Sequence, residues 1–507
     1  MIVHVNKNSR QALYKQIVEQ LRLQIFSGEM PPGYRLPPER QLAEAIGVNR
    51  TTVLTAYREL KAEGLIESHV GRGTVVSHTN TLDQSKIKPE SGPMWEHLFS
   101  DSGRSLDNVA IEYILQLINQ KDIISFAGGI SSLDPRPVEA IEGLEKELLH
   151  DARKRALLVS PVEGFYSLRK CMADFMNARG CFCQPEEIMM VSGAQQGIDL
   201  VARTLLNPGD TVLVEEPSYF PAIHTFKAAG ARLMEIPMTA EGVDLDILER
   251  LLQRYRPKFI YTMPTYQNPA GVTLSVPGRI KLLELAYKYQ AVVVEDDPYS
   301  ELRYDGDAPP SLKSMDSRGF VIYISSFSKT VSPGLRLGWI CCQRKMLRAL
   351  AAVKQFTDVH TSSISQYIVE RFMSEGKLER YMAAICASNR QRRDVMIESF
   401  ERFAASDELA WNRPPGGSYV WCALPKGVTA TGLFNAATRN GVAILPGTLF
   451  TLSPHNGENF IRLNFTYESS DTIRKGIKLL CEQISRLQKE HRTHRGITLI
   501  HDVNPIE

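Results

Sequence analysis

The sequence predicts a multidomain protein with an N-terminal winged helix-turn-helix, a large α/β domain and a smaller C-terminal α+β lobe. Two patterns lead to this fold class. The first 80 residues read as short helices followed by a hairpin, and from about Leu106 short apolar strands alternate with helices. The stretch between them is rich in Ser, Pro, Gly and charge, which is typical of a linker. We therefore expect an N-terminal helix-turn-helix domain at residues 1–78, a linker at 79–105, a large domain at 106–385, a small domain at 386–490 and a C-terminal tail at 491–507.

Composition narrows the class of protein. The 507 residues are 43% hydrophobic and 23% charged, which argues against disordered and fibrous proteins. Lys and Arg number 59 against 57 Asp and Glu, so any nucleic-acid site must be local. The sequence has no run of about 18 apolar residues and no pattern of a signal peptide at its start, so we expect a cytoplasmic protein without a membrane partner. The eight cysteines have neither zinc spacing nor a disulfide framework, so we expect reduced thiols and no metal site.

Three helices and a hairpin are expected in the N-terminal segment. An apolar stripe predicts a helix over residues 11–26, and a second short helix follows over 38–46. Asn49 is a favourable N-cap for a third helix. Two apolar pieces then flank Gly71-Arg72-Gly73, which is the pattern of a hairpin with a basic tip. This order of elements is that of a winged helix-turn-helix.

The basic and hydroxyl side chains of this segment suit DNA. Arg50, Thr51 and Thr52 lie at the start of the third helix, where a recognition helix meets base edges and phosphates. Arg40 on the preceding helix and Arg72 at the hairpin tip can reach phosphates or a minor groove. The first 80 residues hold ten Lys and Arg and seven Asp and Glu, a local net charge of +3. The alternative is a small helical domain that binds other proteins.

The same segment resembles the winged helix-turn-helix of the GntR family. The resemblance covers roughly residues 11–78 and implies that Arg40, Arg50, Thr51, Thr52 and the Arg72–Gly73 wing face double-stranded DNA. The motifs that carry it are Leu36-Pro-Pro-Glu-Arg40, Gln41-Leu42-Ala43, Gly47-Val-Asn-Arg-Thr-Thr-Val53, Ala56-Tyr57, Leu60, Gly64-Leu65-Ile66 and Gly71-Arg-Gly73.

Polar side chains follow the predicted strands of the large domain. The apolar runs at 188–191, 211–214, 258–262, 291–294 and 320–324 lack polar alternation, as parallel strands buried on both faces do. Ligands of an open α/β sheet bind outside the carboxyl ends of its strands. The residues that follow these runs are Ala194 and Gln195, then Tyr219, then Asn268, then Asp296 and Tyr299, and finally Ser326, Ser328, Lys329 and Arg336.

These are the groups that pyridoxal phosphate needs. Lys329 would form the Schiff base with the cofactor aldehyde, and Asp296 would keep the pyridinium nitrogen protonated, so both have catalytic roles. Asn268 and Tyr299 would donate to the phenolate oxygen, and Tyr219 would stack on the ring. Taken singly, such residues have structural alternatives, for example a helix cap or a surface amine; their joint order favours the cofactor. The residues assigned to its phosphate are Ala194, Gln195, Ser326, Ser328 and Arg336.

Residues 106–490 resemble the class I and II aminotransferases of fold type I. The resemblance implies that Arg462 would bind the α-carboxylate of an amino acid through a two-pronged ion pair. Two positions depart from the pattern: Val159 stands near a position where many of these enzymes have a tyrosine, and Ala194 replaces a common serine. The motifs are Gly164-Phe-Tyr-Ser-Leu-Arg169, Ser192-Gly-Ala-Gln195, Gln267-Asn-Pro-Ala-Gly271, Asp296-Asp-Pro-Tyr299, Ser326-Phe-Ser-Lys-Thr330, Pro333-Gly-Leu-Arg336, Pro415-Gly-Gly417 and Ile461-Arg-Leu-Asn464.

The order of these parts resembles the MocR subfamily of bacterial transcription regulators. The resemblance covers nearly the whole chain. It implies a homodimeric regulator that binds pyridoxal phosphate, responds to it or to an amino-acid or amine adduct, and changes its binding to a DNA operator. Two alternatives stay open: an active aminotransferase with an attached DNA-binding domain, and a DNA-binding protein whose large domain is only a dimerisation scaffold. The intact cofactor set argues against the scaffold, which would not need it.

Overall fold

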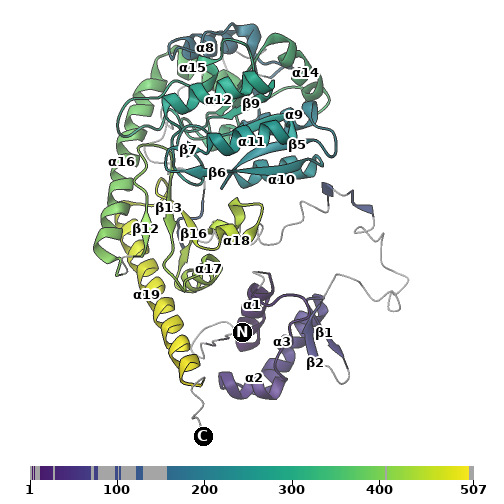
Figure 1. Cartoon of the computed structure of the whole chain (residues 1–507), viewed down its shortest axis with the longest axis vertical. Coiled ribbons are helices and arrows are strands. Elements are labelled where there is room, and N and C mark those ends of the chain that lie inside the picture. Colours follow the sequence, from purple (N-terminus) through teal and green to yellow (C-terminus); the bar gives the residue numbers. More distant parts are fainter. Residues whose placement is uncertain are drawn as a thin grey trace. The chain divides into compact units, whose positions relative to one another are not determined.

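The computed structural model of the chain consists of two compact units (Figure 1). One comprises Met1–Phe99 with Asp107–Ile114, and the other comprises Ser100–Leu106 with Leu115–Glu507. The structure describes residues 3, 5, 12–26, 29–69, 73–77, 98–100, 102–103, 122–128, 157–405 and 408–501. Most of the expected linker, and Arg72 at the expected wing tip, lie outside the described residues.

The first unit is a winged helix-turn-helix, as the sequence predicts. Its helices are α1 (Leu13–Phe26), α2 (Glu39–Ile46) and α3 (Arg50–Ala62). Strands β1 (Ile66–His69) and β2 (Gly73–Val76) form an antiparallel hairpin. The three helices pack around fully buried side chains that include Ile17, Leu21, Val53 and Leu60. These residues recur at helical spacing, which is why the apolar pattern predicted the helices.

Two local features of this unit differ from the sequence-based prediction. Residues 33–36, for which the sequence predicted no pairing, are hydrogen-bonded to β2. Gly33 N donates to Val76 O at 2.8 Å, and Leu36 N donates to Thr74 O at 2.8 Å. Asn49 occupies the N-cap position of α3, but its side chain makes no capping hydrogen bond.

The second unit is built on a mixed sheet of eight strands in the order β4-β11-β10-β9-β8-β5-β6-β7. All five strands expected from apolar runs are present, and β5, β9 and β10 continue two residues further than expected, to Glu216, Asp296 and Ser326. Strand β11 runs antiparallel between β10 and β4, so β4, β5, β8, β9 and β10 all point the same way. The strands are β4 (Ile188–Val191), β5 (Thr211–Glu216), β6 (Arg232–Thr239), β7 (Gly242–Val243), β8 (Phe259–Thr262), β9 (Val292–Asp296), β10 (Val321–Ser326) and β11 (Gly338–Cys341).

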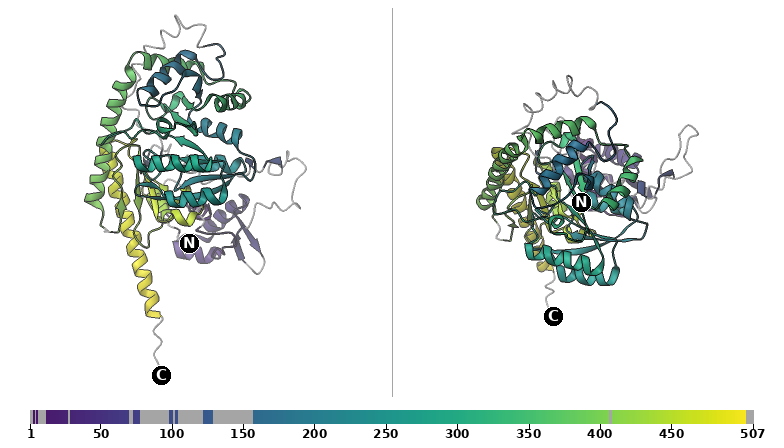
Figure 2. Two further views of the ribbon diagram at one scale, coloured as in Figure 1. Left: turned by 45° about the horizontal axis from the view of Figure 1, so that its top comes forward. Right: turned by 90° about the horizontal axis from the view of Figure 1, so that it is seen from above.

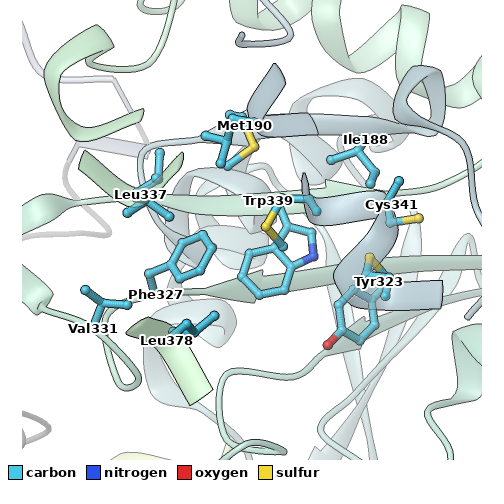
Figure 3. Packing of buried hydrophobic residues seen from close by; sticks show 14 of the residues in the cluster. Ile188, Met190, Tyr323, Phe327, Val331, Leu337, Trp339, Cys341 and Leu378 are labelled. Atoms are coloured by element: carbon cyan, nitrogen blue, oxygen red, sulfur yellow. The ribbon is translucent and has the colours of Figure 1, made fainter. Parts of the chain in front are cut away.

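Helices cover both faces of this sheet (Figure 1). One face packs against α9 (Ala194–Leu205), α10 (Phe220–Ala228) and α14 (Arg344–Gln355). The other face carries a core of aliphatic residues beneath α11 (Leu245–Tyr255) and α12 (Val276–Tyr289), and an aromatic cluster beneath α8 (Tyr166–Asn177) and α15 (Ser363–Ser374). Figure 3 shows the rings of Phe327 and Tyr323 around Trp339, with the Phe327 and Trp339 centroids 4.9 Å apart. Burial on both faces explains why the strands read as continuous apolar runs.

The small α+β lobe has a four-stranded sheet, β12 (Ala410–Trp411), β13 (Tyr419–Ala423), β16 (Phe460–Asn464) and β15 (Leu445–Pro446). Helices α16 (Lys377–Phe403) and α19 (Ser470–His501) run side by side along it (Figure 2), and α17 (Ala430–Arg439) completes it. The expected boundary after residue 385 falls inside α16. The sequence did not predict that β3 (Ile124–Ser125) joins this lobe by pairing with β14 (Val442–Ala443). Short helices lie at α13 (Leu312–Met315), α18 (Pro454–Gly457), Pro185–Glu187, Pro333–Leu335 and Gly447–Phe450.

Among the residues that the structure describes, no helix is both long enough and apolar enough to cross a membrane.

Gly338 lies where β11 passes close to two other backbone segments, so this position has no room for a side chain. A Cβ atom there would lie 2.5 Å from Ser325 O and 3.1 Å from Ala194 N. Because backbone atoms cannot rotate aside, we expect Gly338→Ala to lower the free energy of unfolding by about 1–3 kcal/mol, measured by chemical denaturation of the full chain. Gly334→Ala is the matched control, since its Cβ would meet only Ser332 Oγ at 3.6 Å. An equal loss in both variants would contradict the expectation.

Candidate functional site

The predicted site residues of the second unit gather at the carboxyl ends of the parallel strands. A chain of hydrogen bonds links them: Arg462 Nη1 donates to Asn268 Oδ1 at 3.0 Å, and Asn268 Nδ2 to the Tyr299 hydroxyl at 3.5 Å. The Tyr299 hydroxyl donates to that of Tyr419 at 3.2 Å. Arg462 and Tyr419 lie on β16 and β13 of the small lobe, whereas the other two follow strands of the large sheet. The site is therefore formed by both lobes.

Asp296, the last residue of β9, is a buried carboxyl with one unused oxygen. Asp296 is only 1% exposed, and its Oδ2 accepts a hydrogen bond from the Tyr261 hydroxyl at 2.6 Å. Oδ1 has no hydrogen-bond partner in the described part of the chain. Burial raises the pKa of Asp296 to about 7 despite the hydrogen bond from Tyr261, and the nearby Asp297 and Glu215 add to the increase. A cationic N–H placed at Oδ1 would stabilise the charged form.

Lys329 lies on the turn that follows β10 and is partly buried. Burial lowers its pKa below the usual value; Tyr419 opposes this effect, and the charges of Arg462 and Arg336 add to it. A lower pKa favours the neutral amine, which is the nucleophilic form. The pKa of Tyr219 is raised by burial and by the charge of Asp296, so this ring lies within electrostatic range of Asp296.

The start of α9 forms one side of a group of residues here called the cradle and defined as Ser192–Gln195 with Ser326, Ser328 and Arg336. Helix α9 begins at Ala194, two residues after Ser192. The first N–H groups of a helix, which include those of Ala194 and Gln195, have no acceptor within the helix and carry partial positive charge. They are suited to a phosphate group.

The other side of the cradle carries hydroxyls and an arginine. Arg336 Nη1 donates to Ser328 Oγ at 3.3 Å, and Arg336 Nη2 donates to Ser192 O at 3.2 Å. The Ser326 hydroxyl donates to Ser328 Oγ at 2.8 Å. Gly193 has φ +89°, and a Cβ atom there would lie 2.6 Å from Arg336 Nη2. Only glycine therefore leaves room for the guanidinium at this turn.

Arg462 is a buried cation, 3% exposed, with one N–H unused. Its Nη2 donates to Ala127 O at 2.8 Å, and its guanidinium carbon lies 4.1 Å from the centroid of the Tyr419 ring. Its Nε has no partner among the described residues. An arginine held in this way is oriented for a planar carboxylate.

Sequence reasoning missed two tyrosines of this site. Tyr261 lies within a strand that was read only as buried and apolar, although its hydroxyl holds Asp296. Tyr419 stands two residues after the Pro415-Gly-Gly417 motif, which was a usable signal for it. Burial acts to raise the pKa of Tyr419, but the charges of Arg462 and Lys329 lower it below its usual value.

The predicted DNA-facing residues of the first unit lie on its surface where described. Arg50 and Thr51 are exposed at the start of α3, and Thr52 is partly buried. The Arg40 side chain is 83% exposed and pairs with Glu44 at 3.2 Å. Arg35, which sequence reasoning missed, lies beside the wing: a Cβ atom on Gly73 would lie 3.1 Å from Arg35 Nε. Its pairing with Val75 through an isolated β-bridge has no signal in the sequence pattern.

Each of the two units matches a known protein family. Residues 121–480 match the family described as aminotransferase class I and II. The chain belongs to this family. Residues 13–76 match the family described as bacterial regulatory proteins, gntR family. The chain therefore has the MocR-type architecture, a GntR helix-turn-helix joined to a fold-type I aminotransferase domain.

Three similar proteins illustrate the match. An uncharacterized HTH-type transcriptional regulator of Bacillus subtilis, YisV, is 33% identical over 95% of this chain and 98% of its own length. The probable rhizopine catabolism regulatory protein MocR of Rhizobium meliloti is 28% identical over 92% of this chain and 93% of its own length. The crystal structure of the alpha-aminoadipate aminotransferase LysN of Thermus thermophilus, complexed with N-(5'-phosphopyridoxyl)-L-leucine, superposes with a TM-score of 0.73 and is 34% identical, covering 78% of this chain and 100% of that one.

The cofactor of this family is pyridoxal phosphate, and the residues present fit it. Asp296 offers a buried carboxylate oxygen that lacks a partner in the described structure, which suits a pyridinium N–H. The cradle offers helix N–H groups, hydroxyls and Arg336. A carboxylate at one end and a cradle of donors at the other match the charges of the two ends of the cofactor.

The buried carboxyl of Asp296 should make stability depend on pH. Its pKa of about 7 exceeds that of an unfolded aspartate near 4, so the folded cofactor-free protein binds more protons than the unfolded chain between about pH 4 and pH 7. Its contribution to stability is therefore lost as pH rises through this range. We expect Asp296→Asn to gain stability relative to the wild type on going from about pH 5 to about pH 8, measured by urea unfolding of the cofactor-free protein.

The exposed Asp246 provides the control, since Asp246→Asn removes a carboxyl at the surface of α11. The free energy of unfolding of Asp246→Asn should change between about pH 5 and about pH 8 as that of the wild type does. The same result for Asp296→Asn would contradict a raised pKa of Asp296.

Proposed function

We propose that the chain is a DNA-binding transcription regulator that binds pyridoxal phosphate and changes its DNA binding in response to this cofactor or to its adduct with an amino acid or amine. The observation that carries the proposal is that one chain combines an exposed recognition-helix start, at Arg50 and Thr51, with a buried Asp296 whose Oδ1 lacks a partner among the described residues. The first feature suits DNA and the second suits the cofactor.

We assign a role to each of the candidate site residues, and their positions support these roles. Bound pyridoxal phosphate supplies an aldehyde that reacts with amines and a ring that accepts electrons. Lys329 would hold the cofactor covalently, and Asp296 would keep its ring nitrogen protonated. Asn268 and Tyr299 would donate to the phenolate oxygen, while Tyr219 would stack on the ring. The cradle would hold the phosphate through Ala194, Gln195, Ser326, Ser328 and Arg336, and Arg462 would bind the carboxylate of an amino-acid effector.

The DNA-binding part would consist of residues 1–78, joined by the linker 79–105 to an effector part that continues to residue 490. Arg40, Arg50, Thr51, Thr52 and the Arg72–Gly73 wing would face the double-stranded operator. We also propose a homodimer, which a DNA site with two related half-sites would reflect. A DNA-binding role supports a cytoplasmic location.

A second candidate function is an active aminotransferase with an attached DNA-binding domain. Arg462 favours it, because a buried guanidinium with an unused N–H in the described structure is suited to an amino-acid substrate. One experiment distinguishes the two functions: amino acids are added and the absorbance of the bound cofactor is followed. Complete conversion with release of a keto acid supports the enzyme, and a stable spectral change without turnover supports the sensor.

Lys329 should be the point of covalent attachment. Purified protein should be yellow, and borohydride should fix the cofactor to a peptide that contains Lys329, because reduction makes the bond to the amine permanent. Lys329→Ala should abolish the fixed adduct, as measured by mass spectrometry. Lys345→Ala, which changes a surface lysine of α14, is the control. Retention of the adduct in Lys329→Ala would contradict the assignment.

Arg50 should read bases. It begins α3 and is exposed, so we expect Arg50→Ala to cost about 1–3 kcal/mol of binding to the operator and to relax its sequence preference. Arg72→Ala should instead weaken all sequences alike and reduce the salt dependence, because a wing contact to phosphate acts through counterion release. Binding titrations of full-length protein at several salt concentrations measure both effects. A uniform loss with Arg50→Ala would contradict base reading.

A further inference from the structure

An ion pair between a fully buried lysine and a partly exposed aspartate is hydrogen-bonded to the cradle. The Lys354 side chain, on the last turn of α14, is 0% exposed, and its Nζ lies 2.6 and 2.8 Å from the two carboxylate oxygens of Asp358. Burial lowers the pKa of Lys354 and the Asp358 carboxylate opposes that change. The Lys354 charge is therefore costly to bury, and its attraction to the partly exposed Asp358 offsets part of this cost.

The pair is hydrogen-bonded to the residues on which the cradle is built. Asp358 Oδ2 accepts from Gln196 Nε2 at 2.7 Å and from Ser192 Oγ at 3.4 Å. Gln196 Oε1 in turn accepts from Ser192 N at 2.7 Å and from Lys354 Nζ at 3.3 Å. The backbone N–H of Ser192 is thus held by Gln196 of α9, and its hydroxyl is held by Asp358, which follows α14.

Ser192 connects this network to the cradle arginine. Its carbonyl oxygen accepts from Arg336 Nη2 at 3.2 Å, so one residue is held by Asp358 and Gln196 and itself holds Arg336. Arg336 is exposed, and without such a contact its long side chain would have many conformations. The network therefore restricts both the main chain at the start of α9 and the position of the cradle's guanidinium.

The segment that carries Asp358 is itself held in place. Val359 has φ +65°, a conformation that a β-branched residue adopts only where its surroundings enforce it. Two residues later, Thr361 Oγ1 donates to Met190 O at 3.1 Å, within the strand that leads into Ser192. The segment thus braces the end of β4 at one point and the turn after it at another.

We propose that Lys354, Asp358 and Gln196 are positioning residues that set the affinity of the cradle for a phosphate monoester by fixing Ser192 and Arg336 before the ligand binds. The proposal rests on the proposed function, because it takes the cradle as the site of the cofactor phosphate. Preorganised donors increase affinity because their ordering cost is met on folding rather than on binding. A network with only a general role in stability would affect all ligands of the site equally.

The test compares two ligands that differ only in the phosphate, pyridoxal phosphate and pyridoxal. Each is titrated into the cofactor-free full-length protein and its binding is followed by absorbance. In Asp358→Asn, the dissociation constant for pyridoxal phosphate should rise about tenfold, which corresponds to about 1.4 kcal/mol. That for pyridoxal should change less than about twofold, because pyridoxal makes no use of the cradle.

Two further variants make the result interpretable. Gln196→Met removes the hydrogen bonds at nearly constant volume and leaves the ion pair intact, so it tests the network even if Asp358→Asn folds poorly. In this variant too, the dissociation constant for pyridoxal phosphate should rise more than that for pyridoxal. Asp199→Asn is the matched control, because Asp199 lies on the same helix in a surface pair 3.9 Å from Arg203; it should bind both ligands as the wild type does.

The outcomes separate the two proposals. Equal weakening of both ligands, or unchanged affinity for pyridoxal phosphate in well-folded Asp358→Asn and Gln196→Met, would overturn the positioning role alone. A wild-type protein that binds neither ligand would overturn the proposed function and the inference together.

Discussion

The central constraint of this molecule is a carboxyl group, Asp296, buried at the end of β9 with one of its oxygens unpartnered in the described structure. Among the described residues the Tyr261 hydroxyl is the one donor to this carboxyl, and the neighbouring Asp297 and Glu215 raise its pKa further. A buried charge needs a partner. The fold is therefore electrostatically incomplete at this point, and a ligand with a cationic N–H at Oδ1 completes it.

This constraint gives a physical basis for regulation. A ligand that binds only the folded state stabilises it by an amount that grows with its concentration. If binding also differs between two arrangements of the chain, the ligand shifts their populations, and DNA must change the affinity for the ligand by the same factor. A regulator of this design needs no catalytic turnover, and an intact cofactor site is compatible with either role.

Patterns of burial and turn residues predicted most of the fold, and they predicted that the candidate site residues lie at the carboxyl ends of the strands. The five apolar runs gave the parallel strands, and the residues just after them gave Asp296, Lys329 and Arg336. What the sequence did not predict depends on contacts between distant segments. Tyr261 appeared as one more residue of a buried strand, and the pairing of β3 with β14 joins segments more than three hundred positions apart in the numbering. Neither leaves a periodic signal.

In the proposed assignment, the two ends of the cofactor site differ in their exposure. Asp296, at the proposed ring end, and Arg462, the proposed carboxylate site, are buried, so their interactions are little screened by salt. At the proposed phosphate end, Arg336 is exposed and is hydrogen-bonded to Ser192. Arg462 lies on β16 of the small lobe, whereas the cradle belongs to the large one. A ligand bound as proposed, with both a phosphate and a carboxylate, would therefore contact the cradle of the large lobe and Arg462 of the small lobe, whereas the free cofactor has no carboxylate for Arg462. An amino-acid adduct would for this reason be better suited than the free cofactor to change how the two lobes pack.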